Sequence, residues 1–214
     1  MFSHVKLADL NNRRNSAYLI ATVGAIFLAI IIYTQLASNP TQYETKLAQK
    51  RAQKDFQFKN SPESPIDREA KEDFEGLRYF PISPVYRLEA QLIPDVQPDT
   101  LTLMTTQGTD YQVVEAGKVT FSLQGGTYAL RAFRYLEPGK NELFIPFQDL
   151  TSGVSTYGGG RYLDVPNTTP LILDFNTAYN PYCVYSSRYV CPLPPAENRL
   201  PLEIRSGEMM FPGE

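Results

Sequence analysis

The distribution of hydrophobic and polar residues divides the chain into three parts. Residues 17–36 (AYLIATVGAIFLAIIIYTQL) are apolar and uncharged, residues 41–59 are mostly polar with apolar residues at helical spacing, and from about residue 86 the two kinds alternate. A helix needs about 20 apolar residues to cross the hydrocarbon core of a membrane. The pattern predicts a transmembrane helix at 17–36, then a polar helix, then a domain of β-strands.

The charges beside the apolar run predict its orientation. Arg13 and Arg14 lie close to its N-terminal end, whereas the first basic residue on the other side is Lys46. Because basic residues favour the cytoplasmic side, we expect a single-pass membrane protein with a cytoplasmic tail at 1–16 and its C-terminal domain outside the cytoplasm. A cleaved signal peptide is the alternative, but the run is longer than the ~7–15 apolar residues usual in such a signal.

The segment between the apolar run and the alternating region is expected to be a basic helical stalk and linker at 37–66. Residues 41–59 are rich in Gln, Lys and Ala and poor in helix breakers. Two prolines then interrupt the helix, because proline lacks a backbone donor. A short helix from about Asp67 to Gly76 is expected to begin an extracytoplasmic β-domain at 67–214.

Alternation of apolar and polar residues identifies the strands. In residues 86–92, YRLEAQL, apolar side chains alternate with Arg, Glu and Gln, which is typical of a strand with one wet face. Similar segments follow at 101–105, 111–115, 118–123, 127–136, 142–147, 161–165, 171–176 and 200–205. Short turn-forming sequences such as Ala116-Gly117 separate them. The pattern predicts a mainly β fold, an antiparallel β-sandwich or partly open barrel, with helices only on the N-terminal side.

Charge and the single histidine narrow the possible functions. The formal net charge is −3, and because residues 1–59 are basic, residues 60–214 carry −8. Such a domain would repel nucleic-acid phosphates, so we expect no nucleic-acid partner. The one histidine, His4, lies across the membrane from the domain in the expected orientation. This excludes histidine-dependent hydrolases and histidine-ligated metal sites, and we expect no cofactor and no metal.

Cys183 and Cys191 are expected to form a disulfide. Seven residues separate them, a spacing unlike the paired cysteines of zinc sites, and disulfides are favoured outside the cytoplasm. Two buried thiols, or a metal or redox function, remain as alternatives. The bond would fix the loop that contains Tyr185 and Tyr189.

A polar patch is the candidate binding site. It consists of Arg161, Asp174, Asn176, Asn180 and Glu197. Alternation places Asp174 and Asn176 on one face of a strand end, and Arg161 follows three glycines whose backbone donors could face an anion. In the structural alternative, Asp174 is the buried counter-ion of Arg161, Glu197 caps a turn, and the glycines permit a close hairpin crossing.

Three carboxylates allow two further interpretations. Asp174, Glu197 and Glu208 could hold a hard cation, or Asp174 and Glu197 could act as acid and base in a glycosidase-type pair. Sequence spacing does not distinguish these chemistries from structural ion pairs.

Several motifs resemble those of a known family. They are FEGLRYFP at 74–81, FIPFQDLTSG at 144–153, TYGGGRY at 156–162, DFN at 174–176, AYNPYC at 178–183 and CPLPPAENRL at 191–200. Together they resemble the bacterial family called domain of unknown function 1684, over about residues 43–211. The resemblance implies a shared fold and an exported setting, and it supplies no activity, cofactor or catalytic residue.

The sequence therefore predicts a membrane-anchored extracytoplasmic β-domain that binds an envelope ligand or a partner protein. A carboxylate-based hydrolase acting on an envelope polymer is one alternative. The other is an accessory subunit of a membrane complex, in which Gly24 and Ala25 permit close helix packing.

Overall fold

The structure, a computed structural model, describes residues 22–28, 41–96, 99–136 and 139–211. The chain forms two compact units, residues 1–46 and residues 47–214. In the first unit, residues 22–28 form a helix with exposed side chains. The rest of the expected transmembrane segment and the expected tail at 1–16 lie outside the described residues. Within the described ranges, no helix is both long enough and apolar enough to cross a membrane.

Helix α2 (Gln42–Asn60) begins with a reciprocal cap. The backbone N–H of Thr41 donates to Oε2 of Glu44 at 2.6 Å, and the N–H of Glu44 donates to the Thr41 hydroxyl at 3.2 Å. This capping box satisfies two donors that the first turn would otherwise leave free. The prediction of a helix at 41–59 is confirmed.

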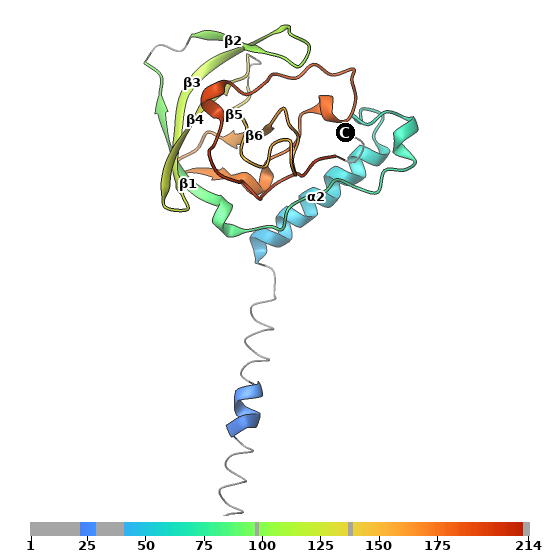
Figure 1. The fold of residues 1–214 in the computed structure, drawn as a ribbon, viewed down its shortest axis with the longest axis vertical. Coiled ribbons are helices and arrows are strands. Elements are labelled where there is room, and N and C mark those ends of the chain that lie inside the picture. The colour runs from blue at the N-terminus through green and yellow to red at the C-terminus, as the bar shows by residue number, and fades with distance from the viewer. Residues whose placement is uncertain (1–21, 29–40, 97–98, 137–138, 212–214) are drawn as a thin grey trace, which may run out of the picture. The chain divides into compact units, whose positions relative to one another are not determined.

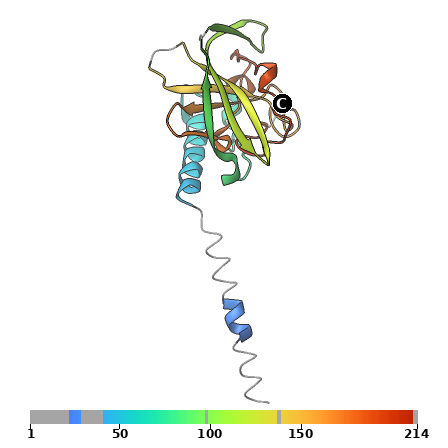
Figure 2. The same ribbon diagram turned by 90° about the vertical axis from the view of Figure 1, so that its left-hand side faces the viewer.

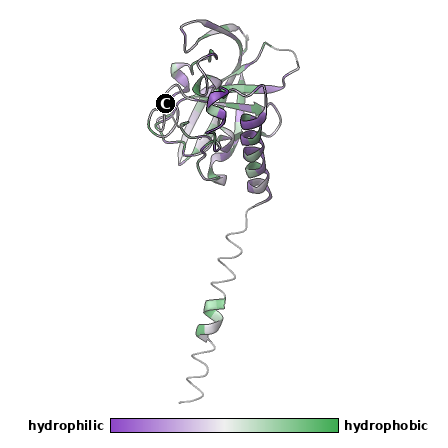
Figure 3. Cartoon of the chain, turned by 90° about the vertical axis from the view of Figure 1, so that its right-hand side faces the viewer, coloured by the Kyte–Doolittle hydropathy of each residue, from purple (hydrophilic) through white to green (hydrophobic). Residues whose placement is uncertain are grey.

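The C-terminal part of α2 packs on the β-domain. Leu47 and Phe58 are buried, and Arg51 donates to the carbonyls of Phe80 and Asn176. Figure 1 shows this part of α2 running along one side of the strands, and Figure 3 shows that its surface is largely hydrophilic. Residues 47–60 are thus a packed element of the domain, in contrast to the free stalk that their polar composition suggested.

The described strands form one antiparallel sheet that is nearly closed into a barrel. They are β1 (Arg87–Pro94), β2 (Thr100–Met104), β3 (Asp110–Leu123), β4 (Gly126–Arg134), β5 (Glu142–Phe147), β6 (Arg161–Pro166) and β7 (Leu171–Asp174). Their order is β6-β5-β4-β3-β1-β7, with β2 paired to β3. A bridge between Tyr162 in β6 and Tyr179 after β7 brings the ends of this order together. The predicted mainly β, barrel-like fold is confirmed, and Figures 1 and 2 show the strands curving around a common centre.

One expected turn is a bulge inside a long strand. The sequence suggested a turn at Ala116-Gly117, but β3 continues through it, and its register with β4 shifts between Glu115 and Gly117. Gly117 has φ +134°, and a Cβ there would lie 2.1 Å from the carbonyl oxygen of Ile93. The glycine permits a bulge and a close approach of β1, which the sequence alone does not distinguish from a turn.

Two other expected elements are wrong. No strand forms at 200–205. The segment makes two backbone hydrogen bonds with residues 148–150, Leu200 N–H to the Gln148 carbonyl and Leu150 N–H to the Leu202 carbonyl. The N–H of Ile204 then donates to a side chain, Oδ1 of Asp149, at 3.2 Å. The helix expected from Asp67 is only a 3-10 turn at Glu69–Lys71. The chain after that turn bonds instead to α2, where Lys59 donates to the Phe74 carbonyl.

Alternation in β5 and β6 separates two hydrophobic clusters. The residues that point into the barrel and fill its core include Leu143, Ile145, Phe147, Leu163 and Val165. Phe144 and Tyr162 point to the opposite face and pack in a second cluster with Cys191. Side chains thus fill the barrel interior, and the outer face of β5 and β6 lies beneath the segment that contains Cys191.

Candidate functional site

Arg161 is buried inside the protein and bonds only to internal groups. Its side chain is 0% exposed and pairs with Asp149 at 2.9 Å. It also donates to the carbonyls of Ile204, Ser206 and Glu208. Burial lowers the pKa of Arg161, and the charge of Asp149 opposes that effect. The structural alternative paired Arg161 with Asp174, but the carboxylate that pairs with Arg161 is Asp149.

Asp174 and Asn176 lie together, as alternation predicted, but their side chains form hydrogen bonds with other groups of the chain. Oδ1 of Asp174 accepts the N–H of Asn176 at 3.0 Å and so caps a 3-10 turn at 175–177. The Asn176 side chain accepts from the N–H of Ser83 at 2.9 Å and donates to the Ser83 carbonyl at 2.8 Å. It also accepts from the hydroxyl of Ser206 at 2.8 Å.

Asn180 belongs to the same internal network, whereas Glu197 does not. The backbone N–H of Asn180 donates to Oε2 of Glu208 at 2.8 Å, and the Glu208 side chain is only 2% exposed. Glu197 is 62% exposed and lies 3.4 Å from Arg131. Contacts with residues 204–209 therefore link Arg161, Asn176 and Asn180, and Glu197 pairs elsewhere.

The three carboxylates singled out for chemistry all form ion pairs. Asp174 pairs with Arg87, Glu197 with Arg131 and Glu208 with Lys54. In the part of the chain that the structure describes, no group of three His, Cys, Asp or Glu side chains is arranged to hold a metal ion.

The last of the three glycines before Arg161 lies at a close backbone crossing. Gly160 has φ +94°, and a Cβ there would lie 2.5 Å from the carbonyl oxygen of Phe147. This contact agrees with the structural alternative, in which glycine permits close packing.

The two cysteines are neighbours but not bonded. Both are free thiols, so the expected disulfide is absent from the structure. The N–H of Cys183 donates to Sγ of Cys191 at 3.1 Å. The thiol of Cys183 also donates to Cys191, which lowers the pKa of Cys191 to about 7 despite burial and raises the pKa of Cys183.

A pocket of about 510 Å³ lies on the outer face of β5 and β6, and we call it the tyrosine pocket. Half of its described lining residues are aromatic: Tyr111, Tyr135, Phe144, Tyr162, Tyr179, Tyr182 and Tyr189. The charged residues among the lining are Lys54, Lys140 and Asp164. Such a cavity falls within the ~300–1,000 Å³ range of small-molecule sites, which combine aromatic walls with a few polar groups.

Asp164 is the polar centre of this pocket. Its Oδ1 accepts the hydroxyl of Tyr135 at 2.7 Å, and its Oδ2 accepts the hydroxyl of Tyr179 at 2.6 Å. Burial and the charge of Asp164 raise the pKa of both phenols above the ordinary value. Both tyrosines therefore remain neutral hydrogen-bond donors to Asp164.

The aromatic side chains form a continuous wall. Ring centroids are 5.2 Å apart for Tyr135 and Phe144, 4.9 Å for Phe144 and Tyr162, and 5.8 Å for Tyr162 and Tyr179. Aromatic pairs at these separations stabilise one another, so the wall is a preformed surface.

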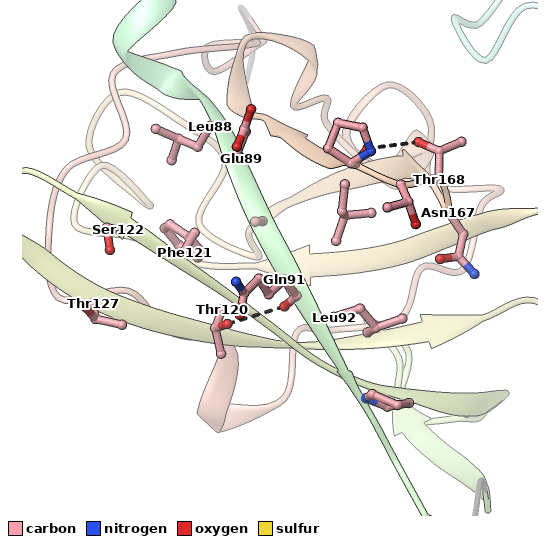
Figure 4. Close-up of a pocket in the computed structure, with 15 residues that line it drawn as sticks. Leu88, Glu89, Gln91, Leu92, Thr120, Phe121, Ser122, Thr127, Asn167 and Thr168 are labelled. Carbon is pink, nitrogen blue, oxygen red and sulfur yellow. Dashed lines mark hydrogen bonds between the residues drawn. The ribbon is translucent and has the colours of Figure 1, made fainter.

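A larger groove, of about 970 Å³, runs along β1 and is a weaker candidate. Among its described lining residues Glu89 alone is charged, and the Thr120 hydroxyl donates to the carbonyl of Gln91 within the sheet. Figure 4 shows the polar side chains spread along the groove, with Ser122 and Asn167 far apart. Volume alone does not make a site; convergent polar groups favour the tyrosine pocket.

Sequence reasoning missed the tyrosine pocket, although one signal was available. In β6, alternation places Tyr162 and Asp164 on the face opposite Leu163. The sequence alone therefore placed the carboxylate of Asp164 beside the aromatic ring of Tyr162 on one strand face. The other walls come from distant segments, which spacing along β6 does not reveal.

Comparisons with known proteins agree with the predicted resemblance. A family model described as "Protein of unknown function (DUF1684)" matches residues 72–209. A solution NMR structure of an uncharacterised protein from Haloarcula marismortui is 35% identical with a TM-score of 0.64, covering 80% of this chain and 96% of that chain. The comparison with curated proteins gives no match. The matched range contains every lining residue of the tyrosine pocket except Lys54.

Proposed function

Because the chain belongs to the DUF1684 family of proteins of unknown function, we propose its function from its own geometry: the domain binds a small organic molecule in the tyrosine pocket. The proposed ligand has an apolar or planar body, which contacts the aromatic wall. It also has a polar group that reaches Asp164.

The convergence of the aromatic rings on Asp164 carries this proposal. The rings come from β3, β5, β6, the residue after β4 and the segment 179–189. A carboxylate with a hydroxyl donor on each oxygen is held in one orientation. Rigid placement of a charge inside an aromatic wall favours recognition, because less ordering is needed when a ligand binds.

A tryptophan reporter tests the proposal. The chain has no tryptophan, and Val190 lines the tyrosine pocket at 41% exposure, so Val190→Trp places a single tryptophan there, which can be excited selectively over the tyrosines. The full chain in nonionic detergent is titrated with small amines, carboxylates and monosaccharides. We expect at least one compound to change the emission and to raise the melting temperature of the unsubstituted protein.

Two charge-neutralising variants test which of the two cavities binds the compound. Asp164→Asn is expected to weaken binding at least about tenfold, since hydrogen bonds to charged groups contribute about 1.5–3 kcal/mol. Glu89→Gln, in the groove along β1, should leave binding unchanged. The proposal would be contradicted if no compound of the panel bound. It would also be contradicted if binding were lost in Glu89→Gln but not in Asp164→Asn.

We also propose that residues 17–36 anchor the domain to a membrane, with the domain outside the cytoplasm and its ligand in the cell envelope. The uncharged, apolar composition of this segment supports the anchor. Its described part is helical and exposes Val23, Ile26, Phe27 and Leu28. The acidic domain argues against a nucleic-acid partner.

In an oxidising setting we further propose a Cys183–Cys191 disulfide. The hydrogen bond from Cys183 to Sγ of Cys191 supports this pairing, because the two residues are already adjacent. Peptide mapping of membrane-derived protein without reductant tests it, and two free thiols would contradict it. We do not extend the proposal to hydrolysis, since Asp174, Glu197 and Glu208 each form an ion pair.

A further inference from the structure

We infer that Cys191 and Cys183 are a thiol–disulfide exchange pair whose substrate is a small organic disulfide bound in the tyrosine pocket. The inference rests on the proposed function and adds to it the chemical class of the ligand and a reaction. It follows from the place of Cys191 in the pocket, the adjacency of the two cysteines and the donors around each of them.

Cys191 is the cysteine that belongs to the tyrosine pocket. It lines the cavity together with Tyr162 and Tyr189 of the aromatic wall, whereas Cys183 is not among the described lining residues. Because Cys191 is only 5% exposed, a reagent that reaches it has to enter the cavity. Cys191 is therefore the residue that attacks a bound disulfide.

The groups around Cys191 favour its thiolate, which is the attacking species. Its Sγ accepts the backbone N–H of Cys183 at 3.1 Å, and the thiol of Cys183 and the N–H of Tyr182 also donate to it. These donors lower the pKa of Cys191 from 9 to about 7. At pH 7 about half of Cys191 is then ionised, against about 1% of an ordinary thiol. Since a lower pKa also weakens the nucleophile, the net rate advantage is about fivefold.

Cys183 is placed to complete the exchange. Its hydrogen bond to Cys191 raises the pKa of Cys183 and so keeps its proton in the reduced pair. The side chains of Tyr157 and Thr106 also hydrogen-bond to Cys183 and act in the opposite sense. When Cys191 is bonded to a substrate sulfur it carries no negative charge, so its effect on Cys183 is lost. Cys183 then ionises more readily than in the reduced pair.

Two displacements transfer the electrons. The thiolate of Cys191 attacks one sulfur of the substrate RS–SR, which breaks that S–S bond, forms a mixed disulfide and releases RS⁻. Cys183 then attacks Sγ of Cys191, forms the Cys183–Cys191 disulfide and releases the second RS⁻. The pair loses two electrons and two protons, and the substrate becomes two molecules of RSH. The disulfide proposed above is thus the oxidised state of the exchange pair.

Reaction with 4,4′-dithiodipyridine tests the exchange. This neutral disulfide has two aromatic rings, and each thiopyridone that it releases is measured by absorbance. The full chain in nonionic detergent is first reduced and freed of reductant. We expect about two equivalents of thiopyridone per chain. Mass spectrometry should find the Cys183–Cys191 disulfide in the product and no pyridyl adduct.

Serine variants assign the two roles. Cys183→Ser cannot complete the exchange, so we expect it to release about one equivalent and to stop at a mixed disulfide on Cys191. Cys191→Ser should react at least about fivefold more slowly than Cys183→Ser, because its remaining thiol does not line the tyrosine pocket.

A wall residue tests whether the pocket guides the reaction. Tyr189 is partly buried in the wall, and Tyr128, partly buried but not in the tyrosine pocket, is the matched control. The rate with dithiodipyridine should fall about 2–10-fold in Tyr189→Ala, through the loss of an aromatic contact. It should not change in Tyr128→Ala. Bis(2-hydroxyethyl) disulfide has no ring, so its rate should fall in neither variant.

Four results would overturn the inference. They are two pyridyl adducts on one chain, equal rates for the two serine variants, an undiminished rate in Tyr189→Ala, and loss of the folded circular dichroism spectrum on reduction. The last would make the disulfide purely structural. Absence of exchange beside binding of a compound from the earlier panel would reject the exchange and leave the proposed function in place. Failure of that panel would instead reject the proposed function.

Discussion

The consecutive glycines at 158–160 have different structural roles. A Cβ on Gly158 would have Cα of Gly153 as its nearest neighbour, at 3.7 Å, which is ordinary contact. A Cβ on Gly160 would overlap the carbonyl oxygen of Phe147, and its φ of +94° disfavours any other residue. One position of the motif is therefore fixed by sterics and the other is not.

Alanine substitutions distinguish these two glycines. Gly160→Ala should lower the free energy of unfolding by about 2 kcal/mol or more, from the unfavourable φ and the overlap with Phe147. Gly158→Ala should change it by less than about 0.5 kcal/mol. Urea unfolding of the full chain measures both, and equal effects would show that the glycines are interchangeable.

Individual partners were the least predictable feature of this chain. The sequence marked Arg161 and Asp174 as polar residues in a conspicuous block, but the carboxylate that reaches Arg161 is Asp149. Which acid meets a buried guanidinium depends on how β6 lies against its neighbours, and spacing contains no such information. The tyrosine pocket was missed for the same reason, because its walls meet only in the folded chain.

The segment between Cys183 and Cys191 covers the outer face of the sheet. Tyr189 and Cys191 line the tyrosine pocket, and the thiol of Cys183 donates to Cys191. That donation, together with backbone N–H groups of Cys183 and Tyr182, lowers the pKa of Cys191 to about 7. The segment thus contributes both a pocket wall and, when the cysteines are reduced, a thiol with a lowered pKa.

The pH dependence of alkylation tests the state of this thiol. The thiolate is the nucleophile, so carboxamidomethylation of Cys191 should be slow below its pKa and reach half its maximal rate near pH 7. Cys183→Ala removes the main donor and should move the midpoint up towards the ordinary value of 9. Mass spectrometry of the reduced full chain after timed iodoacetamide treatment, with Cys191→Ser as the blank, measures the rate. An unshifted midpoint in Cys183→Ala would exclude the thiol donor as the cause.

Elements with a clear strand pattern in their sequence were predicted well. β5 occupies 142–147, as its sequence indicated, because its apolar run LFIPF is buried on both faces and a turn-forming sequence precedes it. Segments held by contacts with distant residues were not predicted, as at 200–205, where Asp149 supplies a hydrogen-bond partner. Periodicity therefore identifies strands of the sheet. It does not distinguish them from an extended segment that hydrogen-bonds to side chains.

The whole molecule combines an acidic domain with the uncharged apolar segment at 17–36. If this segment anchors the protein, charges placed within it should release the protein from membranes. Arginine at the centre of a spanning helix costs about 2.5–3.5 kcal/mol. Two arginines in the segment should therefore weaken membrane association more than a charge placed on the surface of the domain.

The double variant Ile26→Arg with Leu28→Arg tests the anchor. It should move the full chain from the carbonate-resistant membrane pellet to the supernatant. Val154→Arg, at a position of the domain that is 80% exposed, is the control and should stay in the pellet. The anchor would be rejected if the unsubstituted chain already appeared in the supernatant, or if both variants fractionated alike.

The ion pair of Arg161 also constrains how the protein is made. The carbonyl groups that its guanidinium contacts lie up to 47 residues later in the chain. At about 5–20 residues per second, a ribosome needs roughly 2–9 s to add them after Arg161. During that interval the guanidinium cannot make its final hydrogen bonds. A ribosome stalled before residue 204 would therefore hold a chain in which Arg161 lacks the three carbonyl groups that surround it in the folded protein.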